Sequence, residues 1–204
     1  MTIYRSTAGL DDLRVVGVSL AHPDTAAAEH WLASLVSQPV LACTHLVQSP
    51  RPHVALSLGF ASSGAAASAL EAASASASEA ASEGAATAAF AAAGAAAAAA
   101  QFAAAGAAAV AAHEGRQSGR AVVYPGVEVL VGTMSVAEIL ALSAITQVEV
   151  LGSGIADPAA LVETGDFVRP QWRAGELVLT TTPAAGDRLV PFETRNPTPC
   201  CAAH

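Results

Sequence analysis

Residues 61–112 constrain the fold of this 204-residue chain more than any other segment, because 32 of these 52 residues are alanine. Alanine has the highest intrinsic helix propensity, so the segment is expected to be helical. A single helix of this length would extend for about 75 Å, well beyond the diameter of a domain of this size. We therefore expect a break near Gly84 and a hairpin of two helices.

The same segment has an uncharged stretch between Ala85 and Ala112 that is long enough to span a bilayer. Its side chains of the kind that drives membrane insertion are Phe90, Phe102 and Val110. Three such residues are too few, so a membrane-spanning helix is disfavoured. The small residues Gly94 and Gly106 suit close helix packing within the chain or between copies, which predicts self-association.

The charge of the chain excludes several classes of function. The net charge is −8 and all nine basic residues are arginine, which argues against a nucleic-acid partner. The complete lack of lysine excludes a Walker-type phosphate loop, a pyridoxal-phosphate enzyme and a protein kinase.

Two further features predict a cytoplasmic location. Asp11 and Asp12 precede the first apolar run, and no export signal is visible before them. Three cysteines, at unequal spacing, do not form a disulfide framework, and we expect them to be reduced.

The first 60 residues predict strand, helix, strand and strand. The β-branched run at 13–20 predicts the first strand, and Asp24 is expected to be the N-cap of a helix that extends to Val36. Residues 40–47 and 53–60 predict two strands joined by a turn.

Ordinary composition resumes after Gly115. Residues 121–131 predict a strand interrupted by Pro125 and Gly126, and Ser135 with Glu138 forms a capping box that opens a helix to about Ile145. The remaining expectations are a strand at 147–151, a short helix at 157–163 and a β-meander of strands at 167–172, 176–181 and 188–192.

These elements predict an α+β fold. The first six elements follow the order βαββαβ, which is the order of a ferredoxin-like sandwich. In this interpretation the alanine-rich hairpin is an insert and the β-meander forms the C-terminal end. The expected division is a core formed by 1–60 and 115–195, a helical insert at 61–114 and a Cys/His tail at 196–204. Because many unrelated functions share this element order, it indicates no function.

A metal site is one hypothesis. Thiolate and imidazole are ligands of Zn²⁺ and Cu(I), and the candidate ligands are Cys200, Cys201, His204, Cys43 and His45, with His53 nearby. Such a site would require the tail to fold back onto the strands. The usual Cys-x₂-Cys spacing is missing, which favours a solvated, oxidisable tail instead.

Three other clusters are candidates for chemistry. Residues 59–64 could hold an anion at a helix start, although a serine cap is favoured. His22, at a strand end, is a candidate for acid–base work against a simpler capping or surface role. Asp166, Arg169 and Arg173 could bind a carboxylate or form an ion-pair network on the exposed face of the meander.

The sequence therefore favours a non-catalytic protein that self-associates through its small-residue helices. The first alternative is a thiol-dependent protein that binds Zn or Cu. The second is a small-molecule enzyme or ligand-binding domain with a site around His22 and Arg169.

Overall fold

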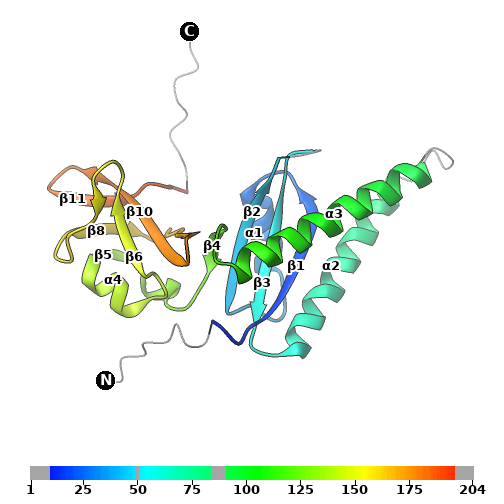
Figure 1. Cartoon of the computed structure of the whole chain (residues 1–204), viewed down its shortest axis with the longest axis horizontal. Helices are drawn as coiled ribbons and strands as arrows, with labels where there is room; N and C mark the ends of the chain where they lie inside the picture. Colours follow the sequence, from blue (N-terminus) through cyan, green and yellow to red (C-terminus); the bar gives the residue numbers. More distant parts are fainter. Residues whose placement is uncertain (1–9, 49–50, 84–90, 196–204) are drawn as a thin grey trace, which may run out of the picture.

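The computed structural model describes residues 10–48, 51–83 and 91–195 and has the predicted α+β class. One mixed sheet runs through the molecule, with helices packed on its two ends (Figure 1). Its main path has the strand order β1-β3-β2-β4-β9-β10-β11-β8-β5.

The N-terminal end of the sheet consists of β1 (Arg14–His22), β2 (Leu41–Val47), β3 (His53–Phe60) and β4 (Arg120–Val123). β3 pairs antiparallel with both β1 and β2, and β4 adds to the outer edge of β2. In a ferredoxin-like sandwich the last strand lies beside the first one. The position of β4 beside β2 therefore does not confirm that sandwich.

The helix α1 (Thr25–Ala33) begins where the sequence predicts. Asp24 is its N-cap, and its carboxylate accepts a hydrogen bond from the Ala27 amide at 2.8 Å. The helix ends earlier than the predicted Val36, because a local turn follows Ala33 and leaves Val36 exposed.

The alanine-rich segment forms two helices, α2 (Ser63–Glu83) and α3 (Ala91–Glu114) (Figure 1). α2 packs beside α1 over the face of the N-terminal strands that carries Leu56 and Leu58, whereas α3 packs on the opposite face, over Ala55. The predicted break at Gly84 lies outside the described residues. The backbones of Gly17 and Gly106 touch where α3 crosses β1, and a Cβ at Gly17 would lie 2.0 Å from the Gly106 carbonyl oxygen. In the described ranges, no helix has both the length and the hydropathy that membrane crossing requires.

The C-terminal end of the molecule is mostly strand. Its elements are β5 (Gly132–Ser135), α4 (Val136–Leu142), β6 (Gln147–Val150), β7 (Gly154–Ile155), β8 (Leu161–Gly165), β9 (Gln171–Arg173), β10 (Glu176–Ala184) and β11 (Arg188–Pro191). The predicted meander is present as the antiparallel series β9-β10-β11, although its first strand begins at Gln171 rather than at Phe167. The predicted capping box of Ser135 and Glu138 also opens α4, although this helix ends at Leu142 rather than near Ile145.

Two local predictions are wrong. The strand expected at 121–131 ends at Val123, because Pro125 lacks an amide donor and Gly126 turns the chain with a φ of +85°, after which a 3₁₀ turn, η1 (Val127–Val129), follows. The helix expected at 157–163 is absent, and β8 occupies its second half. Val162 and Thr164 are buried while their neighbours are exposed, which is the alternation of a strand.

The apolar side chains form two main clusters. One lies between α1, α2 and the strands β1 to β3, and its largest members include Leu32, Leu56, Leu58 and Phe60. The other lies under α4 and the C-terminal strands, around Tyr124, Ile139, Trp172 and Leu177. β4 connects the two halves, and the cavity described next lies where α1 faces the C-terminal strands.

Candidate functional site

A cavity of about 980 Å³ lies between α1 and the face of the C-terminal strands. Its wall carries four arginine side chains, from β4, from the segment before β9, from β9 itself and from the segment after β11: Arg120, Arg169, Arg173 and Arg195. These are four of the nine basic residues of a chain whose net charge is −8. The cavity therefore gathers nearly half of the basic residues of the chain.

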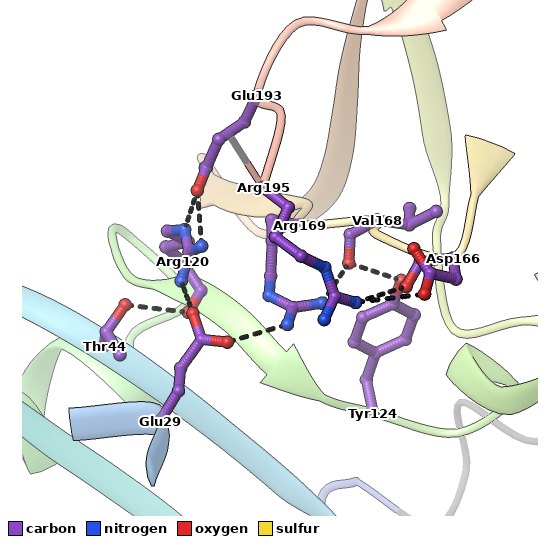
Figure 2. A network of polar contacts seen from close by, with 9 residues as sticks. All are labelled: Glu29, Thr44, Arg120, Tyr124, Asp166, Val168, Arg169, Glu193 and Arg195. Carbon is purple, nitrogen blue, oxygen red and sulfur yellow. Dashed lines mark hydrogen bonds and ion pairs between the residues drawn. The ribbon is translucent and has the colours of Figure 1, made fainter. Parts of the chain in front are cut away.

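Glu29 of α1 holds the two most buried arginines in place (Figure 2). One of its carboxylate oxygens accepts a hydrogen bond from Arg120 Nη1 at 2.6 Å and the other accepts one from Arg169 Nη2 at 2.7 Å. Arg120 also pairs with Glu193. This bridge joins α1 to both β4 and the C-terminal half, so it fixes the geometry of the cavity wall.

The environment of Glu29 keeps it ionised. Burial acts most strongly and raises the pKa of Glu29, but the hydrogen bonds and charges of Arg169 and Arg120 together outweigh burial, so the pKa is lowered. Burial likewise opposes the charge of Arg120, but Glu193 and Glu29 raise its pKa. The paired charges are therefore retained in the folded protein.

Phe167 supports the arginine cluster. The guanidinium carbon of Arg169 lies 4.2 Å from the centre of the Phe167 ring, and those of Arg195 and Arg120 lie 5.4 and 5.8 Å from it. A ring face attracts cations, so one aromatic side chain stabilises three guanidinium groups close to one another. Arg169 also has a buried Nε that makes no hydrogen bond within the described residues.

The other two arginines are held more loosely. Arg173 pairs with Glu149 at 3.2 Å and Arg195 pairs with Asp166 at 3.2 Å, and about half of each arginine side chain is exposed. Exposed ion pairs of this kind contribute about 0 to 1 kcal/mol, so an incoming anion can replace either carboxylate at little cost. Glu29 and Glu193 are the only carboxylates among the described lining residues, and Glu149 and Asp166, which do not line the cavity, pair with the other two arginines.

The structure brings two of the three residues predicted to bind a carboxylate to the wall of the same cavity. Arg169 and Arg173 both line the cavity, and Asp166 lies at its edge as the partner of Arg195. His22 does not line the cavity. It lies beside Trp31, and burial lowers its pKa despite the opposing charge of Asp24.

Sequence reasoning missed the roles of Glu29, Arg120, Phe167 and Arg195. The sequence did contain a partial indication of the arginine cluster, because three of its four arginines fall within residues 169–195. Nothing in the sequence connects Glu29 with Arg120, which is 91 residues away, since only the approach of α1 to β4 brings them together.

The predicted metal ligands are only partly described. Cys200, Cys201 and His204 lie outside the described residues. Cys43 and His45 lie on β2, where burial raises the pKa of the Cys43 thiol to about 12 although contacts with Trp172 and Ser57 oppose it. Among the described residues, no three His, Cys, Asp or Glu side chains are arranged to hold a metal ion.

His45 belongs instead to a buried hydrogen-bonded trio. His45 Nε2 lies 2.8 Å and His113 Nδ1 lies 3.0 Å from the hydroxyl of Ser57, which is fully buried. Burial lowers the pKa of both histidines to about 4. The charge of His113 contributes a smaller part of the lowering for His45, and the charge of Arg116 does so for His113. His53, the other histidine considered with these residues, bonds separately to Ser19 and to the Arg51 carbonyl.

The glycine-serine segment at 59–64 has the geometry of a helix cap. The Ser62 hydroxyl accepts a hydrogen bond from the Ala65 amide at 3.2 Å, at the start of α2. This contact uses one of the amide groups that an anion would need.

Comparisons with protein-family models, with curated proteins and with solved structures find no match to this chain.

Proposed function

We propose that this chain is a ligand-binding protein that takes a small anionic molecule, a carboxylate or a phosphate, in the cavity between α1 and the C-terminal strands. The observation that carries the proposal is the convergence of Arg120, Arg169, Arg173 and Arg195 on one cavity in an otherwise acidic chain.

The geometry of the guanidinium group supports an anionic ligand. Its planar fork of N–H donors matches the oxygens of a carboxylate or phosphate, and such charged hydrogen bonds are stronger than neutral ones. Arg120 and Arg169 are already committed to Glu29, so their role is to shape the wall. Arg173 and Arg195 are half-exposed and form single ion pairs, so they are the side chains best placed to exchange a protein carboxylate for a ligand.

The size of the cavity also fits this function. Small-molecule sites are usually concave, with volumes of about 300 to 1,000 Å³, and combine apolar walls with a few polar groups. The cavity of about 980 Å³ lies at the upper end of that range and has both kinds of wall.

Calorimetric titration with benzoate and with inorganic phosphate tests the proposal. We expect saturable binding of at least one of them to the full chain, and an affinity about tenfold or more lower in Arg195→Gln and in Arg173→Gln. That factor corresponds to the loss of one charged hydrogen bond, worth about 1.5 to 3 kcal/mol.

Arg188→Gln is the matched control, because Arg188 is about as exposed as Arg173, pairs with Glu163 and does not line the cavity. Its affinity for the anion should equal that of the unaltered chain. Equal losses in all three variants would indicate nonspecific charge screening and refute the proposal, as would the failure of both anions to bind.

Self-association through the helical hairpin is a second candidate. The outer part of α2 and α3 reaches beyond the edge of the sheet (Figure 1), and α3 presents small side chains such as Ala100 and Ala104 to solvent. If the hairpins of two copies pack together, light scattering will give at least twice the chain mass, and Ala100→Glu with Ala104→Glu will restore the monomer. A monomer at all concentrations would rule this candidate out.

A further inference from the structure

Two large apolar side chains are exposed in the wall of the arginine-lined cavity. Leu151 is 56% exposed and Phe192 is 59% exposed, and both line the cavity. Scattered exposed apolar residues are common on protein surfaces, but two in the wall of one concave site are a reason to consider an apolar part of the ligand.

The strand register places these two side chains on one face of the sheet. β10 lies between β6 and β11, so the residues after those two strands flank it on either side. The Leu151 amide donates to the Thr181 carbonyl at 2.8 Å, and the Phe192 amide donates to the Thr180 carbonyl at 3.0 Å. Side chains alternate along a strand, so Leu151 and Phe192 project from the same face as Thr180.

Arginine groups adjoin this apolar wall. Arg173 Nη2 donates to the Thr180 hydroxyl at 3.0 Å, which places the guanidinium over the strand that separates Leu151 from Phe192. Arg195 is three residues beyond Phe192 and lines the same cavity. One cavity therefore offers an apolar wall directly beside cationic groups.

The charge of the wall favours a singly charged ligand over a doubly charged one. Glu29 lies within the wall, and its lowered pKa keeps it negative. Glu193 also lines the cavity, and each of the four arginines already has a carboxylate partner. A single carboxylate, which needs only one or two guanidinium partners, therefore displaces fewer ion pairs than a phosphate dianion would.

We infer that the ligand is a monocarboxylate with an apolar body, an alkyl or aryl carboxylic acid whose carboxylate meets Arg173 and Arg195 and whose body lies on Leu151 and Phe192. This inference rests on the proposed function and adds the class of ligand to it.

A series of straight-chain carboxylates from butanoate to decanoate tests the inference, with titrations kept below the concentration at which they form micelles. Each added methylene that becomes buried contributes about 0.8 kcal/mol, so the Kd should fall about fourfold per carbon until the apolar wall is covered. Decanol, which has the same body without the charge, should bind at least tenfold more weakly than decanoate.

The double variant Leu151→Ser/Phe192→Ser should flatten this dependence of the Kd on chain length. Both side chains are exposed, so the variant is expected to fold, and its circular dichroism will check this. The matched control is Ile155→Ser, because Ile155 is 76% exposed and does not line the cavity.

Three results would overturn the inference in distinguishable ways. A Kd that is independent of chain length, with benzoate still bound through Arg195, refutes the apolar body and leaves the proposed function intact. Tighter binding of phosphate than of every carboxylate refutes the choice of head group. Absence of binding by every anion refutes the proposed function together with this inference.

Discussion

Acidification should destabilise this fold between pH 6.5 and pH 4 through the buried trio of His45, Ser57 and His113. The Ser57 hydroxyl has one proton, so it can donate to only one of the two ring nitrogens that face it and must accept from the other. Two neutral histidines satisfy this arrangement. Protonation of both would make both ring nitrogens donors, so the hydroxyl proton would lose its ring acceptor and two positive charges would lie in a buried site.

The magnitude follows from the pKa values. A histidine with a pKa of about 4 in the folded state and an ordinary value of 6.5 when unfolded binds fewer protons in the folded state throughout this window. The free energy of unfolding is therefore highest above pH 6.5 and falls with decreasing pH. At pH 4.5 the loss for one such histidine is about 2.5 kcal/mol, and the pair can lose at most about twice that.

Urea unfolding at pH 7 and pH 4.5 measures this loss. In His45→Gln the difference in unfolding free energy between the two pH values should shrink by about 2.5 kcal/mol, whatever the absolute stability of the variant. His30→Gln is the control, because His30 is exposed on α1 and should leave the difference unchanged. The explanation is refuted if His45→Gln retains the full pH dependence of the unaltered chain.

Other predictions concern packing, thiol reactivity and metal content. Gly17→Ala should lower the unfolding free energy by about 3 kcal/mol in urea titrations, because its Cβ meets the backbone of α3, whereas Gly64→Ala, with open space around it, should be neutral or stabilising. Cys43 should resist iodoacetamide at pH 8 in the native state and react only in urea, as peptide mass spectrometry will show, because it is buried and its pKa is raised to about 12. If the tail binds Zn or Cu, elemental analysis of Cys200→Ser/Cys201→Ser will show less metal than the unaltered chain, and equal content will exclude that hypothesis.

Local chemistry made several elements predictable. Asp24 before an apolar helical stripe and Ser135 three residues before Glu138 are capping signals that act within one turn, and both caps are present. The apolar run at 53–60 becomes β3, in which every residue is buried. Alanine content predicted the two helices of the insert for the same reason, since helix propensity is a property of short segments.

Tertiary contacts overrode local preference elsewhere. Asp157 followed by Pro158 is a reasonable helix start, but the next residues pair with β11 and bury Val162 and Thr164 instead. The same holds for β4, which pairs with β2 although an order of elements alone leaves its neighbour undetermined. Strand partners depend on long-range hydrogen bonds, so a pattern of single residues does not specify them.

The candidate site shows the same division. The sequence grouped Asp166, Arg169 and Arg173 as residues that could bind a carboxylate, and Arg169 and Arg173 do line the cavity. The ion pair of Glu29 with Arg120 exists only in the folded chain, as does the position of Leu151 and Phe192 on either side of β10.

The composition of the alanine-rich segment was by itself enough to determine that this protein contains long helices, because alanine favours the helix in almost any context. Where those helices lie was decided by the tertiary structure. The close approach of Gly106 to Gly17, 89 positions apart, leaves no room for a side chain at Gly17 and little at Gly106 where α3 crosses β1. Helix formation is a local equilibrium, whereas the choice of a packing partner depends on the shape of a surface that forms only when the sheet does.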